Sequence, residues 1–126
     1  MNHETNYPHK ELTGKIIAAA FEVHSNLGCG FLESVYHEAM KVELNANGID
    51  FQSQCPVSVS YKGVKLKDYL IDLVVNEQVI VELKATKFIE SIFEAQLLNY
   101  LKATGYKIGL LINFGASSLQ YKRLIY

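Results

Sequence analysis

The stretch from residue 70 to residue 84 constrains the fold more than any other part of the sequence. Two apolar runs rich in β-branched side chains, residues 71–75 and 79–83, flank the polar triplet 76–78. Runs of this length and composition on both sides of a polar turn are typical of a buried β-hairpin. We therefore expect these two strands to lie near the centre of a sheet.

Three charged residues interrupt the apolar runs, namely Asp72, Glu82 and Lys84. Side chains alternate between the two faces of a strand, so Glu82 and Lys84 point to the same face. A three-residue loop would place Asp72 directly opposite Glu82 on that face, whereas a two-residue loop would place Asp72 on the other face. The hairpin therefore predicts two opposed carboxylates beside an ammonium group.

Opposed carboxylates repel each other and raise each other's pKa unless a cation lies between them. This arrangement indicates a divalent metal such as Mg²⁺, held by Asp72 and Glu82. Lys84 would then address a phosphate group or an attacking water. The alternative is an edge hairpin whose charges are solvated and carry no chemistry.

Composition bounds the class of protein. With 126 residues and 49% hydrophobic content, the chain fits a single domain with a substantial core. A formal net charge of -1 argues against a constitutive nucleic-acid binder, although a local basic patch would suffice for binding. Cys29 and Cys55 have neither the spacing of a zinc site nor the number of a disulfide framework. We expect a reduced, cytoplasmic protein without a membrane span.

The N-terminal part of the chain predicts a loose polar tail over residues 1–10, followed by one domain over residues 11–126. A helical apolar stripe runs from Leu12 to Leu27 and ends at Gly28. His24 lies on or near this stripe, where a hydrogen-bonded core histidine is the favoured interpretation and a metal ligand the weaker one.

A second helix is expected over residues 32–47, with Gly48 after its end. Glu33 falls in its first turn, where the helix dipole favours a carboxylate, so it is either a helix-capping residue or a third acidic ligand aimed at the hairpin. His37 lies one turn later, and we expect it to be exposed.

Alternating residues beyond Gly48 predict strands over 49–61, a turn at Lys62-Gly63 and a further strand over 64–67, with Pro56 marking an edge or a break. Lys62, Lys65 and Lys67 cluster near the turn, either as protection of a sheet edge or as contacts to a phosphate backbone.

Residues 91–104 predict a third helix, in which Gln96 and Tyr100 are neighbours one turn apart. This pair either contacts a substrate phosphate or the Lys84 strand, or forms an ordinary helix boundary. Strands are expected over 108–114 and 119–126. A helix between two strands implies a parallel crossover.

The chain resembles the GxxExxY family, a branch of the PD-(D/E)XK nuclease-like superfamily, over residues 12–126. Gly30, Glu33 and Tyr36 fit the naming motif. In the superfamily, a glutamate on the first core helix often adds to the site, and the resemblance gives this role to Glu33. Ile71 stands where the superfamily's name has a proline.

Asp72 and the segment from Glu82 to Lys84 are similar to the acidic core of the superfamily. Residues 96–100 look like the Q-x-x-x-Y helix of exonuclease-type relatives. The resemblance implies that Asp72 and Glu82 bind Mg²⁺ or Mn²⁺ and that Lys84 positions or activates the water. It also implies a role for Gln96 and Tyr100 in substrate binding.

The expected fold is therefore α/β, with a restriction-endonuclease-like core and a mixed central sheet of about five strands flanked by helices. The expected function is Mg²⁺-dependent hydrolysis of phosphodiester bonds in DNA or RNA. Nucleic acid is the expected partner, with a homo-oligomer as a further one. The alternative is a non-catalytic binding or oligomerisation module that retains the nuclease-like fold.

Overall fold

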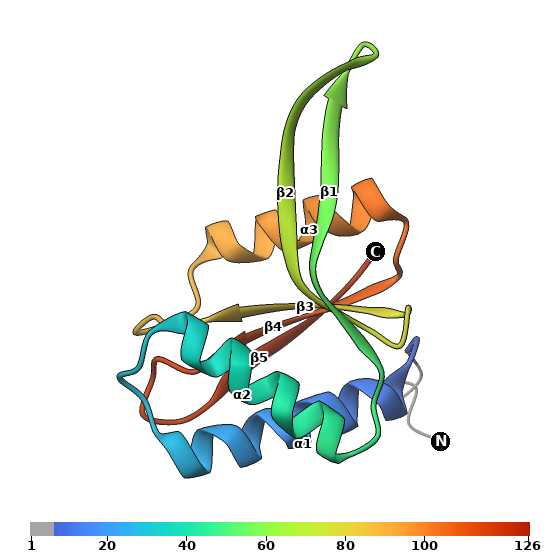
Figure 1. Cartoon of the computed structure of the whole chain (residues 1–126). Helices are drawn as coiled ribbons and strands as arrows, with labels where there is room; N and C mark the ends of the chain where they lie inside the picture. Colours follow the sequence, from blue (N-terminus) through green and yellow to red (C-terminus); the bar gives the residue numbers. More distant parts are fainter. Residues whose placement is uncertain (1–6) are drawn as a thin grey trace.

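The computed structural model describes residues 7–126 and contains a five-stranded sheet with helices on both of its faces (Figure 1). In chain order the elements are α1 Lys10–Leu27, α2 Glu33–Ala46, β1 Phe51–Tyr61, β2 Val64–Val75, β3 Val79–Lys84, α3 Ser91–Thr104, β4 Ile108–Asn113 and β5 Gln120–Ile125. The expected α/β class and the three expected helices are confirmed.

The sheet has the strand order β1-β2-β3-β4-β5. Neighbouring strands are antiparallel except for β3 and β4, which are parallel because α3 connects them as a crossover. Val75 pairs with Val79, so the turn after β2 is the three-residue loop considered above. The predicted mixed sheet with β3 at its centre is confirmed.

Two apolar cores cover the two faces of the sheet. Val81 and Leu83 of β3 pack in the core beneath α1 and α2, whereas Ile80 packs in the core beneath α3. The alternation of side chains along β3 therefore explains why helices lie on both faces. Glu82 is on the same face as Ile80, so its side chain enters the α3 side of the sheet.

The strands β1 and β2 extend beyond the rest of the sheet as a two-stranded ribbon, which stands clear of the body in Figure 1. We call residues 57–70 of this ribbon the arm. The sequence predicted separate strands over 64–67 and 71–75, but β2 runs without a break from Val64 to Val75. Pro56 does not interrupt β1, which is compatible with its place on an edge strand.

The predicted N-terminal tail lies partly outside the described residues, which begin at Tyr7. Tyr7 packs against the core under α1 and α2, and the Arg123 guanidinium lies 5.2 Å from the centre of its ring. α1 begins at Lys10, directly after this contact. Within residues 7–126, no helix combines the length and the apolar character needed to cross a bilayer.

Candidate metal and catalytic site

Asp72 and Glu82 lie where β2 and β3 separate. The register is the one expected from a three-residue loop and sets Asp72 opposite Glu82, but the last Cα pair of the ladder is Leu73 with Val81, one pair earlier than expected. Their side chains bridge the strands instead. The Asp72 backbone N–H donates to Glu82 Oε1 at 3.2 Å, and the Leu83 backbone N–H donates to Asp72 Oδ2 at 2.8 Å. Each carboxyl group is thereby held by the opposite strand.

Glu82 occupies an unfavourable environment for an ionised carboxylate. Only 8% of its surface is exposed. Burial, and secondarily the charge of Asp72, raises its pKa to about 9, and the Lys84 ammonium offsets only part of this effect. A nearby cation would favour the ionised form of both carboxyl groups, so this pair is suited to bind one.

Lys84 and Glu33 complete the charged cluster. Lys84 ends β3, and its ammonium lies 4.6 Å from the centre of the Phe93 ring. Desolvation raises the pKa of Glu33, while the charge of Lys84 lowers it and that of Asp72 raises it. Glu33 and Asp72 also line one open hollow of about 510 Å³. Glu33, in the first turn of α2, thus lies on the same hollow as Asp72 of the hairpin.

Tyr36 fixes the start of α2 and so the position of Glu33. Its side chain is fully buried and stacks on Phe114 with ring centres 4.7 Å apart. The Tyr36 hydroxyl donates to the Gly28 carbonyl at 2.6 Å and accepts from the Phe31 N–H at 3.2 Å. Through these two hydrogen bonds, to residues on either side of Gly30, Tyr36 therefore holds the loop that precedes Glu33.

His37 was expected to be exposed, and this expectation is wrong. The side chain is buried, hydrogen-bonded to Ser53 Oγ at 2.9 Å, and its Nδ1 lies 3.9 Å from Asp72 Oδ1. The signal in the sequence was its place four residues after Glu33, on the same helix face. His37 is thus a neighbour of the acidic pair that the sequence reading missed.

His24 lies outside this cluster. Its Nε2–H donates to the Ala116 carbonyl at 3.0 Å, and its ring lies beside Phe114 with centres 6.3 Å apart. The placement agrees with a hydrogen-bonded histidine at the edge of the core, which the sequence favoured over a metal ligand.

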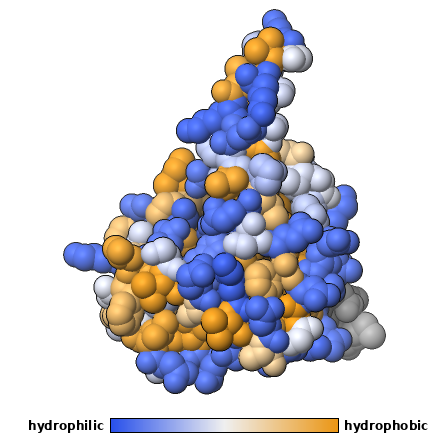
Figure 2. Space-filling view, in the orientation of Figure 1, coloured by the Kyte–Doolittle hydropathy of each residue, from blue (hydrophilic) through white to orange (hydrophobic). Residues whose placement is uncertain are grey.

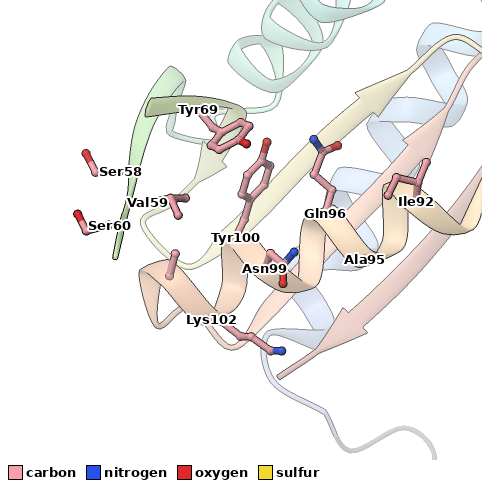
Figure 3. Close-up of a pocket in the computed structure, with 11 residues that line it drawn as sticks. Ser58, Val59, Ser60, Tyr69, Ile92, Ala95, Gln96, Asn99, Tyr100 and Lys102 are labelled. Carbon is pink, nitrogen blue, oxygen red and sulfur yellow. The ribbon is translucent and has the colours of Figure 1, made fainter. Parts of the chain in front are cut away.

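Gln96 and Tyr100 line a cleft of about 660 Å³ between α3 and the base of the arm (Figure 3). Burial, and next the charge of Glu82, raises the pKa of Tyr100 to about 12. Tyr100 also packs in the core beneath α3 together with Ile80, on the sheet face that Glu82 shares. In Figure 3 the side chains of Gln96 and Tyr100 both rise from α3 toward Tyr69 of the arm.

Asn113 holds the chain that follows Lys84. This asparagine is fully buried at the end of β4, where the sequence indicated only a buried strand. Its Oδ1 accepts from the Thr86 and Gly115 N–H groups at 2.9 and 3.1 Å, and its Nδ2 donates to the Thr86 carbonyl at 2.9 Å. The exit of β3 is thereby fixed, and with it the backbone at Lys84.

The donor set fits a hard divalent cation. Among the described residues, no group of three or more His, Cys, Asp or Glu side chains is arranged to hold a metal ion. This excludes a zinc-type cage in that part of the chain but not Mg²⁺, which proteins commonly bind through one or two carboxylates while waters fill its other positions. Asp72 and Glu82 are two such carboxylates.

The comparisons with known proteins agree with this architecture. A model of the PD-(D/E)XK nuclease superfamily matches residues 10–124, and the chain belongs to this superfamily. The superfamily indicates a nuclease-like protein. No curated protein matches the sequence.

The fold is similar to one solved structure, titled "Crystal structure of SSO0001". The two chains superpose with a TM-score of 0.56 at 14% sequence identity, over 93% of this chain and 59% of that chain. This likeness shows the fold alone, and the present chain spans little more than half the length of that protein.

Proposed function

We propose that the protein hydrolyses phosphodiester bonds of DNA or RNA with the help of Mg²⁺ or Mn²⁺. The observation that carries the proposal is the pair of opposed carboxyl groups, Asp72 and Glu82, each held by a backbone N–H at the point where β2 and β3 separate. We also assign the chain to the GxxExxY branch, because Tyr36 links the loop at Gly30 to the position of Glu33.

Each charged residue has a distinct role in this proposal. Asp72 and Glu82 would hold the divalent ion, and Glu33 of α2, on the same hollow as Asp72, would add a third acidic group through a bound water. When bound, the ion supplies positive charge that polarises the phosphate. Lys84, on the same strand face as Glu82, stabilises charge that develops on the phosphate and orients the attacking water. His37 orients the Asp72 carboxylate from the other side.

A second candidate function is a binding or oligomerisation module that uses the same fold without chemistry. The exposed apolar side chains of the arm favour it, since Tyr61, Val64 and Leu66 are each more than half exposed. The two functions differ in one outcome: only the first predicts cleavage of nucleic acid, and it predicts that this cleavage depends on the charged cluster.

The test is cleavage of labelled single- and double-stranded DNA and RNA in Mg²⁺ and in Mn²⁺. Wild type, Glu82→Ala and Lys84→Ala are purified identically. Lys84→Ala should fold normally and lose about 10²–10³-fold in rate, the scale found when one preorganised donor is removed. Lys84→Arg should not restore the full rate, because a planar guanidinium does not replace a compact ammonium.

Unchanged cleavage in both alanine variants would identify a contaminating nuclease. If wild type cleaves none of the four substrates in either metal, hydrolysis is wrong and the binding module replaces it.

A further inference from the structure

The cleft between α3 and the arm lies on the face of the sheet that Ile80 and Glu82 share. Its α3 wall includes Gln96, Asn99 and Tyr100, and its arm wall includes Val59 and Tyr69 (Figure 3). Tyr100 belongs to this wall and packs in the same core as Ile71 and Ile80. A chain that enters the cleft is therefore on the same side of the sheet as Glu82.

The arm presents different chemistry on its two faces. Asp68 is paired within the arm, because it accepts a hydrogen bond from Ser58, itself a lining residue of the cleft, at 2.6 Å and pairs with Lys65 at 2.7 Å. On the cleft face, Val57 pairs with Tyr69 and Val59 pairs with Lys67 across the ribbon. The acidic residue of the arm is thus neutralised by Lys65 and is not among the residues that line the cleft, which are apolar, aromatic and polar together with Lys102.

Tyr69 offers a ring to a ligand in this cleft. Its ring centre lies 5.9 Å from that of Tyr100 at an angle of 53°, so the two rings are tilted and do not stack on each other. The Lys67 ammonium lies 5.1 Å from the centre of the Tyr69 ring. This ammonium lies over one face of the ring, so a flat group that packs against Tyr69 from the cleft would have a positive charge close to it.

The charge of the cleft suits an anionic ligand. Lys102 is part of its lining, and no Asp or Glu is, within the described residues. This contrasts with the net charge of -1 for the whole chain. A flat aromatic ring, a nearby ammonium and an absence of carboxylates in the lining together describe a surface that binds a nucleotide.

We propose that this cleft binds an unpaired nucleotide of single-stranded nucleic acid, with its base against Tyr69 and its phosphates near Lys67 and Lys102. This inference rests on the proposed function, because it places the strand so that an adjacent phosphate reaches Asp72 and Glu82. A duplex is disfavoured since its bases stack on one another, and only an unpaired base can offer its face to a side chain. Duplex binders also contact many phosphates through Lys and Arg side chains, whereas few such side chains lie at this cleft.

Binding is measured separately from cleavage to test the proposal. Fluorescence anisotropy of labelled (dT)₁₂, (U)₁₂ and a 12-base-pair duplex is recorded with the full chain in EDTA at low salt. Wild type should bind at least one single strand more tightly than the duplex. The comparison of (dT)₁₂ with (U)₁₂ distinguishes DNA from RNA.

Two variants of Tyr69 distinguish the effect of its aromatic ring on binding from the effect of its apolar packing. Tyr69→Leu keeps an apolar side chain and should weaken single-strand binding about 10-fold, whereas Tyr69→Phe keeps the ring and should bind like wild type. Tyr61→Leu is the matched control, because Tyr61 lies near the arm turn, outside the cleft. Circular dichroism verifies that each variant is folded.

Three outcomes would overturn the proposal: equal binding of duplex and single strand, unchanged binding in Tyr69→Leu, or no binding of any oligonucleotide. A dimer in light scattering that Tyr69→Leu converts to a monomer would also overturn it, since a second copy would then cover the cleft. Single-strand binding without cleavage would support the proposed binding cleft and contradict the proposed hydrolysis. Cleavage of single strands at an equal rate and KM in wild type and Tyr69→Leu would support the proposed hydrolysis and contradict the proposed binding cleft.

Discussion

One strand, β2, passes through two regions of opposite character. Near its end, Leu73 and Val75 are fully buried and lie in the core beneath α1 and α2, whereas Val64 and Leu66 in the arm are more than 60% exposed. The hydropathy surface shows the arm as a narrow projection with apolar and polar patches side by side (Figure 2). The same backbone ladder therefore supports a buried region and a solvated one.

The two regions satisfy their polar groups in different ways. In the arm, Asp68 and Lys65 pair in water, where an ion pair contributes little to stability. At the acidic pair, the carboxyl groups of Asp72 and Glu82 take the place of ladder hydrogen bonds. Glu82 is buried there with a raised pKa. We therefore expect the buried carboxyl pair to lower the free energy of unfolding of the metal-free protein. The exposed ion pair of the arm should change that free energy little.

The largest expected effect on stability is that of Gly115→Ala. A Cβ atom at Gly115 would overlap the backbone of Thr86, so the segment after Lys84 must shift. We expect a loss of about 3 kcal/mol in the free energy of unfolding, the upper end of the range for overpacked positions. The measurement is urea unfolding followed by circular dichroism.

Gly63→Ala in the arm is the matched control for this substitution. Nothing lies within 4 Å of a Cβ atom at Gly63, and its only obstacle is a φ of +79°. The expected loss is about 1 kcal/mol. If the two alanine variants were equally destabilised, the distinction between a tightly constrained site and a tolerant arm would be lost.

The next effect is the pH dependence of stability in EDTA. Between the usual glutamate pKa of 4.5 and the folded value of about 9, the folded protein keeps a proton on Glu82 that the unfolded chain has released. The free energy of unfolding should therefore fall as the pH rises from 6 to 8, by at most about 1.4 kcal/mol per pH unit. Glu82→Gln should flatten this slope, because the amide oxygen still accepts from Asp72 N–H but does not ionise.

Asp68→Asn in the arm provides the control for the pH series. Hydrogen bonds from Lys65 and Ser58 lower the pKa of Asp68, so its contribution to stability is present above the ordinary aspartate pKa and is lost only in acid. This variant should keep the wild-type slope between pH 6 and 8. Identical slopes in wild type and Glu82→Gln would show that Glu82 is already ionised in the folded protein.

Local sequence patterns were sufficient for the features that depend on strand periodicity. Alternation predicted that Glu82 and Lys84 share one face, and of the two loop lengths considered, the three-residue loop that the structure contains is the one that sets Asp72 opposite Glu82. The helix between residues 91 and 104 predicted the parallel crossover to β4. These features follow from neighbours in sequence, so tertiary packing did not need to be known.

Features that depend on distant contacts were not predictable in this way. The burial of His37 depends on β1, because the His37 ring is hydrogen-bonded to Ser53 of that strand. The role of Asn113 requires the segment at Thr86, 27 positions away in sequence. The projecting arm was missed for a related reason, since alternation predicts a strand but does not tell whether the strand leaves the body of the sheet.

The smallest expected effect is that of shortening the arm. Val59 and Lys67 are ladder partners, so residues 60–66 can be replaced by Asn-Gly, the dipeptide that favours a two-residue hairpin turn. The removed side chains are all exposed. We expect a change of less than about 1 kcal/mol in the free energy of unfolding, as for other surface changes, measured by urea unfolding. Affinity for (dT)₁₂ should fall less than in Tyr69→Leu, because Tyr69 and Lys67 remain in place. A loss of stability as large as that of Gly115→Ala would show that the arm tip supports the core, and a larger loss of affinity than in Tyr69→Leu would move the nucleotide contact from the base of the arm to its tip.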